Sequence, residues 1–144
     1  MTTVTALPLK TRTESIKRGA LAGIAGGIVF GMMMAMMGSL TMIASMVGSS
    51  SAAVGFIVHI MISAAFGMVF GLIGFKTAAS KTQTLIRGSI YGIILWVAGP
   101  LVMMPLMMGM SNMVFSIGGA QLLSLMGHVI YGLVTAYIFA AITK

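Results

Sequence analysis

The chain has 144 residues, of which 59% are hydrophobic and only 6% charged, whereas a soluble domain carries about 25% charged residues. Too few polar side chains are present to cover a water-facing surface, so we expect an all-α, polytopic membrane four-helix bundle. The absence of cysteine excludes disulfides, thiolate metal sites and thiol catalysis. The single acidic residue, Glu14, lies outside every apolar run, which leaves no carboxylate for acid–base catalysis or ion coupling within the membrane.

The first predicted segments are a cytosolic tail over residues 1–17 and a membrane span over 19–38. No signal-peptide cleavage site follows the apolar run, so we interpret it as a retained span. Glycine recurs at every fourth position of this span, which allows close backbone approach between helices in a membrane. The sequence leaves open whether this face packs within the chain or against another copy. The packing glycines are Gly19, Gly23, Gly27 and Gly31.

A rather apolar loop, residues 38–51, follows the first span and is predicted to contain a short interfacial helix. The second predicted span covers 53–75. The polar and basic segment 76–86 is then expected to be a cytosolic linker between two halves, residues 18–75 and 87–144.

The third predicted span, 88–108, combines two aromatic residues with two prolines. Tyr91 suits an aromatic belt at the inner membrane surface. Trp96 lies about 13 Å deeper along a helix, so it should face protein, where its N–H can find an acceptor. Pro100 and Pro105 remove backbone hydrogen bonds and are predicted to kink or break the helix.

The fourth predicted span, 120–142, carries a polar stripe on one helical face, with a tyrosine near its edge. An ionisable side chain within a span is a functional hypothesis by default, which draws attention to the histidine in this stripe. The residues are Gln121, Ser124, His128, Thr135 and, at the edge, Tyr131.

The eight basic residues lie in the N-terminal tail, the middle linker and the C-terminus, and the loops 39–52 and 109–119 contain none. By the positive-inside rule, both termini and the linker should be cytoplasmic in a cell (plasma or inner) membrane. We therefore interpret the net charge of +7 as a signal of topology and expect no nucleic-acid partner.

The two halves resemble each other at a constant offset of 69 residues. Each half contains two spans and so enters the membrane in the same direction. The offset therefore predicts two parallel two-helix repeats, related by a pseudo-twofold axis along the membrane normal. The matched pairs are Arg18 and Arg87, Gly19 and Gly88, Gly23 and Gly92, Met34 and Met103, and His59 and His128.

The motifs Arg87-Gly88-x-x-x-Gly92 and His128-x-x-Tyr131-Gly132 resemble those of small prokaryotic four-span membrane proteins, the YagU-like inner-membrane proteins among them. The first half has the arginine, the glycines and His59 but departs after the histidine, where Ile62 and Ser63 replace Tyr-Gly. The resemblance implies a fold and a membrane location, and it implies no activity.

His59 and His128 admit three interpretations. Each could donate or accept a hydrogen bond within the bundle, the pair could ligate haem b or another metal such as copper, or they could serve a proton relay or a substrate. The outer loops offer no arginine or lysine to haem propionates, which counts against haem.

Methionine is abundant, with 17 residues, and several stack at i, i+4 spacing near the outer ends of the first and third spans. Thioethers together with imidazole suit Cu(I), although methionine also fills irregular gaps in packing. The methionines considered as Cu(I) ligands are Met33, Met34, Met37, Met103, Met104 and Met108.

These observations favour a non-enzymatic membrane protein, a structural or accessory subunit of a larger membrane assembly or of a homo-oligomer. The expected partners are the lipid bilayer and other membrane subunits or further copies of the chain. The alternative is a metal- or haem-binding membrane protein that uses His59 and His128, with the methionine clusters handling Cu(I). A small channel or carrier is the third hypothesis.

Overall fold

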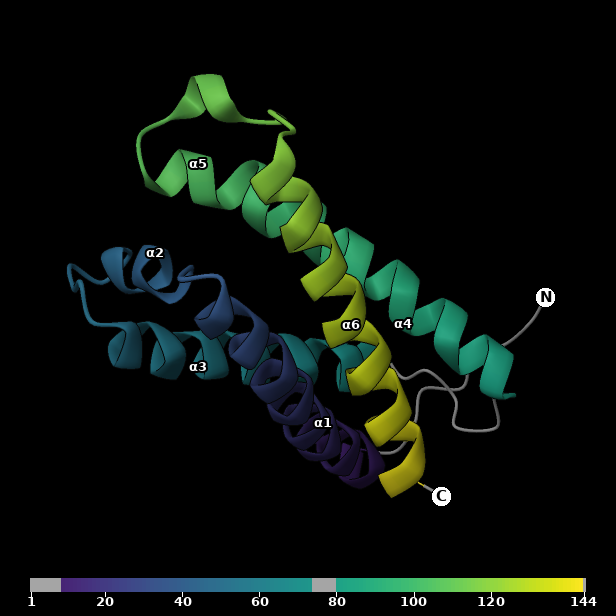
Figure 1. The fold of residues 1–144 in the computed structure, drawn as a ribbon. Coiled ribbons are helices and arrows are strands. Elements are labelled where there is room, and N and C mark those ends of the chain that lie inside the picture. The colour runs from purple at the N-terminus through teal and green to yellow at the C-terminus, as the bar shows by residue number, and fades with distance from the viewer. Residues whose placement is uncertain (1–8, 74–79, 144) are drawn as a thin grey trace.

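The computed structural model describes residues 9–73 and 80–143, and in this part of the chain four long helices form an antiparallel bundle without strands (Figure 1). Four helical segments are long and apolar enough to cross a membrane, the third of them being the stretch Lys81–Met107 that α4 begins, which confirms the predicted all-α four-span fold. The long helices are α1 (Leu9–Met36), α3 (Ala52–Ile73), α4 (Lys81–Trp96) and α6 (Gly119–Ile142). The short elements are α2 (Leu40–Ser45), the π-helix η1 (Val97–Met103), α5 (Met104–Met107) and the 3₁₀-helix η2 (Ser111–Met113).

Two helices begin earlier than the apolar runs predict. α1 already includes residues 9–17 of the predicted tail, and residues 1–8 lie outside the described part of the chain. α4 begins inside the predicted linker because Ser80 and Gln83 form a capping box: the Ser80 hydroxyl accepts the Gln83 N–H at 3.2 Å, and Gln83 Oε1 accepts the Ser80 N–H at 3.1 Å. Polar turns therefore extend both helices beyond their apolar segments.

Glycines bring α1 and α3 into backbone contact. A Cβ atom built on Gly23 would lie 2.6 Å from the Cα of Gly67, and one built on Gly19 would lie 2.9 Å from the Cα of Gly71. Only glycine leaves room for such an approach, which gives membrane helices most of their packing contact. The predicted glycine face of the first span is therefore confirmed as a helix contact, and it lies within one chain.

The second half repeats this kind of contact between α4 and α6, but one helical turn further along. Gly19 packs against Gly67 and Gly71, whereas Gly88, its partner at the 69-residue offset, packs against Gly132, which corresponds to Ser63. In addition, α1 packs along α6, while α3 and α4 make no comparably close contact (Figure 1). In a complete twofold relation, the contact between α1 and α6 would be equivalent to a contact between α4 and α3. The predicted repeat therefore remains a prediction.

The third span is interrupted by the π-helix η1, which contains Pro100. Proline has no N–H, so Pro100 and Pro105 cannot bond the carbonyls four residues before them. The π-helical register compensates by bonding the N–H of Met104 to the carbonyl of Gly99, five residues earlier. Pro105 has no N–H to donate to the carbonyl of Leu101, and this carbonyl accepts the N–H of Phe115 at 3.0 Å. Of the predicted kink or break, the structure shows a change from α-helical to π-helical register at Pro100, within a helical stretch that continues from Lys81 to Met107.

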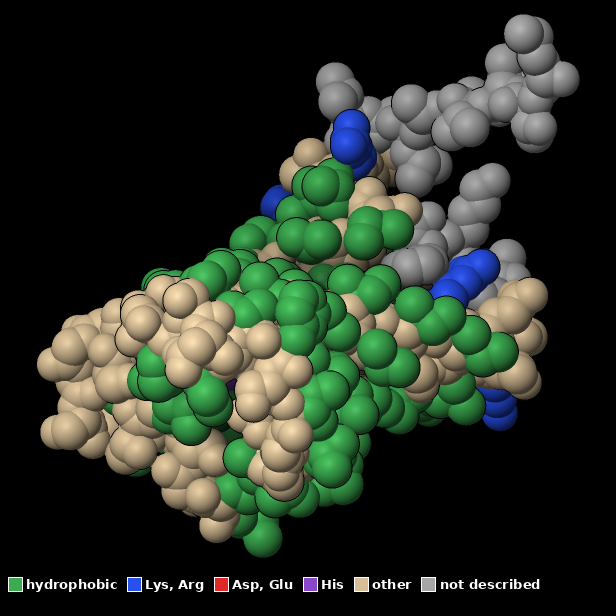
Figure 2. Space-filling model, turned by 90° about the horizontal axis from the view of Figure 1, so that it is seen from above, with side chains coloured by type: hydrophobic (Ala, Val, Ile, Leu, Met, Phe, Trp, Pro, Cys, Tyr) green, Lys and Arg blue, Asp and Glu red, His purple; other side chains and the backbone are tan. Residues whose placement is uncertain are grey.

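The described basic side chains gather at one end of the bundle, the end at which α1 begins and α6 ends (Figure 2). They come from the first turns of α1 and from α4. The loops at the other end contain no charged residue. The charge asymmetry in the sequence is thus an asymmetry between the two ends of the molecule. The described basic side chains are those of Arg12, Lys17, Arg18, Lys81 and Arg87.

The glycine contact can be tested by comparing Gly23→Ala with Gly119→Ala, the same chemical change at two helical positions. We expect Gly23→Ala to lower the free energy of unfolding by about 1–3 kcal/mol, because its Cβ would overlap the α3 backbone. A Cβ on Gly119 of α6 meets no atom within 4 Å, so Gly119→Ala should be neutral or slightly stabilising. Thermal unfolding in detergent measures both, and equal stabilities of the two variants would contradict the contact.

Candidate site around Phe30 and the two histidines

The two histidines lie against one aromatic ring in the interior of the bundle. The ring of Phe30 on α1 lies 5.3 Å from the ring of His59 on α3 and 4.8 Å from the ring of His128 on α6, centroid to centroid. Both pairs are edge-to-face, a favourable geometry for aromatic rings. Residues 69 positions apart in the sequence therefore share one neighbour.

Glycines on two helices make the space for this cluster. A Cβ on Gly127 of α6 would lie 2.7 Å from Cζ of Phe30, so the ring packs directly on the α6 backbone. A Cβ on Gly31 of α1 would lie 3.1 Å from Cδ2 of His59. The rings of Phe30 and His59 can take these positions because Gly127 and Gly31 have no Cβ atom.

His59 connects two helices. Its Nε2 lies 3.1 Å from the carbonyl oxygen of Gly27 on α1. A carbonyl oxygen can only accept, so Nε2 carries the proton and the imidazole donates an interhelical hydrogen bond. The side chain is buried. The interpretation of this histidine as a polar group satisfied by a neighbouring helix therefore accounts for it.

His128 bonds only within its own helix. Its Nδ1 donates to the carbonyl oxygen of Ser124 at 2.8 Å and lies 3.3 Å from the hydroxyl of the same residue. With the proton on Nδ1, Nε2 carries a lone pair, and within residues 9–73 and 80–143 no hydrogen bond reaches this nitrogen. His59 therefore bonds a neighbouring helix, whereas His128 bonds only its own, and in the described bundle Nδ1 of His59 and Nε2 of His128 have no hydrogen-bond partner.

Three further polar side chains of the second half bond backbone carbonyls. The Tyr131 hydroxyl donates to Ser63 of α3 at 2.7 Å, and the Trp96 indole N–H donates to the carbonyl of Gln121 at 2.8 Å. The prediction that Trp96 faces protein and finds an acceptor is confirmed. Tyr91, whose position along the span suits an aromatic belt, faces protein: its side chain is 5% exposed, and its hydroxyl donates to the carbonyl of Phe66 on α3 at 2.6 Å.

The predicted polar stripe of α6 divides into two parts. Gln121 and Ser124 are half-buried near the uncharged end, whereas Thr135 is completely buried. The Thr135 hydroxyl has no hydrogen-bond partner among the described residues and lies against α1, where a Cβ on Gly26 would be 2.6 Å away. This hydroxyl contributes to a tight helix contact, and no group that could react with it lies nearby in the described bundle.

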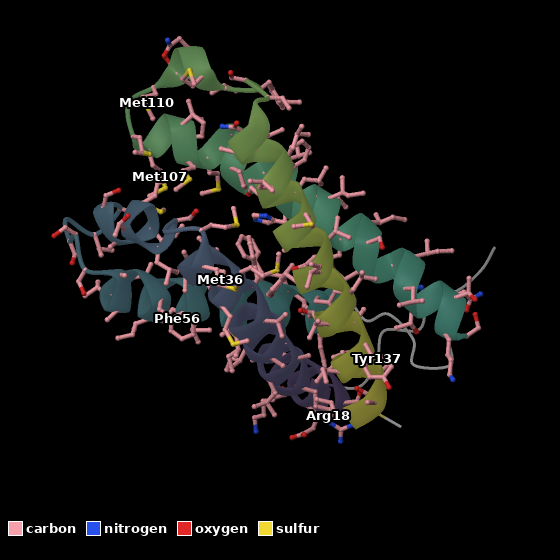
Figure 3. The ribbon with its side chains drawn as sticks, in the orientation of Figure 1. Arg18, Met36, Phe56, Met107, Met110 and Tyr137 are labelled. Carbon is pink, nitrogen blue, oxygen red and sulfur yellow. The ribbon has the colours of Figure 1, made fainter. Side chains whose placement is uncertain are left out.

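The methionines named as Cu(I) ligands are placed unequally. Met34 is 8% exposed and belongs to the same buried cluster as Phe30, and Met33 packs against that cluster. Figure 3 shows the exposed Met36, Met107 and Met110 at the end of the bundle away from Arg18 and Tyr137. Of the remaining candidate ligands, Met104 is half-buried, and those exposed are Met37, Met103 and Met108.

The donor set of this region consists of neutral groups only. No group of three or more histidine, cysteine, aspartate or glutamate side chains occurs in the part of the chain that the structure describes. Imidazole and thioether can bind a soft cation or accept a hydrogen bond. A haem held between the two imidazoles would occupy the space in which Phe30 contacts both rings, so the phenyl ring would have to leave.

Phe30 is the central residue that the sequence analysis missed. A signal for it exists in Ala22, Gly26 and Phe30, a second series at four-residue spacing next to the glycine face. In the bundle this series faces α6, where Gly26 packs against Thr135 and Phe30 against Gly127. α1 thus contacts one helix on each of two adjacent faces and lies between α3 and α6.

Comparisons with known proteins add no relative: no family model, curated protein or solved structure matches the chain. The function therefore has to be inferred from the contacts of the described residues.

The different roles of the histidines can be tested by comparing His59→Leu with His128→Leu. His59→Leu removes an interhelical hydrogen bond, and such bonds contribute about 0.6 kcal/mol and at most roughly 1.7 kcal/mol in membrane proteins. His128→Leu removes only a bond within one helix, so it should lower stability less. Unfolding of the two purified variants in mixed micelles provides the measurement, and a larger loss for His128→Leu would contradict this assignment.

Proposed function

We propose that the chain is a non-enzymatic integral membrane protein that acts as an accessory subunit, in contact with another membrane subunit or a second copy at its uncharged end. The composition of the interior supports this proposal. The buried polar side chains of His59, Tyr91 and Tyr131 are engaged in bonds to backbone carbonyls of neighbouring helices. Such bonds hold helices together and leave few groups for chemistry.

The observation that carries the proposal is the connection between α5 and α6, residues 108–118. This segment contains no charged residue and exposes large apolar side chains, with Phe115 62% exposed. Exposure of apolar surface to water costs about 25 cal/mol per Å², so a loop outside the hydrocarbon region gains from being covered. The exposed apolar residues are Met108, Met110, Met113, Phe115 and Ile117.

The backbone of this loop is fixed. Phe115 has a φ of 59°, an uncommon conformation for a bulky residue, and its N–H bonds the Leu101 carbonyl. The Ser116 N–H bonds the carbonyl of Met113 at 3.0 Å. Strained backbone of this kind persists only where its surroundings determine it, and it clusters at functional sites. A preformed apolar loop loses little conformational freedom on binding, as suits contact with a protein partner.

The orientation that goes with this proposal places both termini at the cytoplasmic face of a cell membrane and the uncharged loop at the opposite face. The grouping of the described basic residues at the end where α1 begins and α6 ends supports it (Figure 2). The resemblance to YagU-like inner-membrane proteins supports the same membrane.

A metal-binding function is the second candidate, because Nε2 of His128 has no hydrogen-bond partner among the described residues and the His128 ring contacts Phe30, which belongs to the same buried cluster as Met34. It differs from the accessory role in requiring a ligand inside the bundle and no partner outside it.

The orientation is tested with epitope tags at the N-terminus, the C-terminus and within the loop at position 112. In sealed, right-side-out cells we expect a membrane-impermeant probe to reach only the tag in the loop. Permeabilised cells give the control in which all three tags react. A terminal tag that reacts in sealed cells would reverse the proposed orientation.

The contact at the uncharged end is tested by site-specific photo-crosslinking in intact membranes. A photoreactive amino acid at position 115 should give one discrete protein adduct, because Phe115 would lie in the interface. The matched control replaces Ile90, which is also apolar and exposed but lies within the apolar run of α4, and it should give lipid adducts only. If position 115 gives lipid adducts alone, the loop lies in the bilayer and the accessory role loses its support.

A further inference from the structure

The lone pair on Nε2 of His128 is held in a fixed direction. The N–H on the other ring nitrogen donates to the carbonyl of Ser124, and the ring face is in contact with Phe30. Metal-binding histidines almost always have this arrangement, in which the non-ligating N–H bonds a carbonyl and thereby fixes the tautomer and the ring orientation. His59 differs because its hydrogen bond connects two helices and so already has a structural role.

Thioethers lie in the same region as this imidazole. Met34 follows Phe30 by one helical turn on α1, so both side chains project from the same face of the helix. Both belong to one buried cluster, and Met33 packs against it. Phe30 contacts the His128 ring. Among the described residues, each imidazole thus keeps one ring nitrogen without a hydrogen bond, and the ring of His128 contacts Phe30, which belongs to the same buried cluster as Met34.

We propose that Nε2 of His128 and the sulfur of Met34 bind a soft monovalent cation of the Cu(I) class, with Met33 as a further thioether at the same site. The chemistry of the donors favours this class of ligand. Imidazole nitrogen and thioether sulfur are neutral, and thioethers select Cu(I) over hard cations. Glu14, the single carboxylate of the chain, lies on the first turns of α1 at the other end of the bundle, so no hard anionic oxygen is available for Mg²⁺ or Ca²⁺.

Thioethers at the uncharged end are exposed and lie outside this site. Exposed methionines lie there on both halves of the bundle, Met36 at the end of α1 and Met107 at the end of α5 (Figure 3). The site itself is defined by His128 and Met34, and it does not depend on the proposed accessory role.

The test uses the purified full-length chain in detergent, with Ag(I) as a redox-inert probe of the Cu(I) class. Equilibrium titration followed by metal analysis should give one tightly bound Ag(I) per chain. We expect His128→Leu and Met34→Leu each to weaken that binding at least about tenfold. Met36→Leu is the matched control: it makes the same chemical change two residues further on, at a side chain that is 89% exposed, and should leave the affinity unchanged.

X-ray absorption of the Ag(I) complex gives an independent readout and should show both nitrogen and sulfur neighbours of the metal. Nitrogen neighbours alone would overturn the participation of Met34. The site is also overturned if the wild type binds no Ag(I), or if Met36→Leu weakens binding as much as Met34→Leu, which would place the ion on surface thioethers. Met34→Leu conserves side-chain volume, so it keeps the test decisive even if His128→Leu fails to fold. The photo-crosslinking result at position 115 is independent of all these outcomes.

Discussion

The close approach of helix backbones at glycines determines the rest of this structure. Lipid is as apolar as a leucine side chain, so burying apolar surface between helices gives little stabilisation in a membrane. Contacts such as Gly23 with Gly67 in the first half and Gly92 with Val129 in the second supply van der Waals packing instead. They also bring side chains of one helix within reach of carbonyls on the next, as the bond from His59 to Gly27 shows. The interhelical hydrogen bonds of the interior therefore depend on the glycines that let the helix backbones approach closely.

The two histidines show how two similar sequence segments acquire different roles. α1 packs against both α3 and α6, whereas α4 packs closely only against α6. His59 consequently faces a carbonyl of the central helix, while His128 turns its N–H back to its own helix. Because the second glycine contact is shifted by one turn, residues at equal positions in the two halves meet different neighbours. Ser63 lies at the position that Gly132 has in the second half. Its backbone carbonyl accepts the hydrogen bond of the Tyr131 hydroxyl.

Features that depend on one helix alone could be predicted from the sequence. Span number, the glycine face, the interruption at Pro100 and the protein-facing position of Trp96 follow from composition, spacing and backbone chemistry. Features that depend on which helix lies opposite could not. Tyr91 was placed at the membrane surface because its distance from the start of the span suits a belt, whereas a carbonyl of α3 is the partner that holds it inside. Phe30 was missed because its importance comes from Gly127, 97 residues away.

The hydrogen bond between Leu101 and Phe115 makes the uncharged loop mechanically continuous with the third span. Pro105 has no N–H to donate to the Leu101 carbonyl, and the N–H of Phe115 bonds this carbonyl instead. The bond therefore connects the end of the loop to the π-helix, with α5 lying between them in the sequence. The π-helix η1 begins directly after Trp96, whose indole N–H bonds the carbonyl of Gln121 in the first turn of α6. The loop at the uncharged end, the π-helix and the start of α6 are thus joined by hydrogen bonds into one continuous unit.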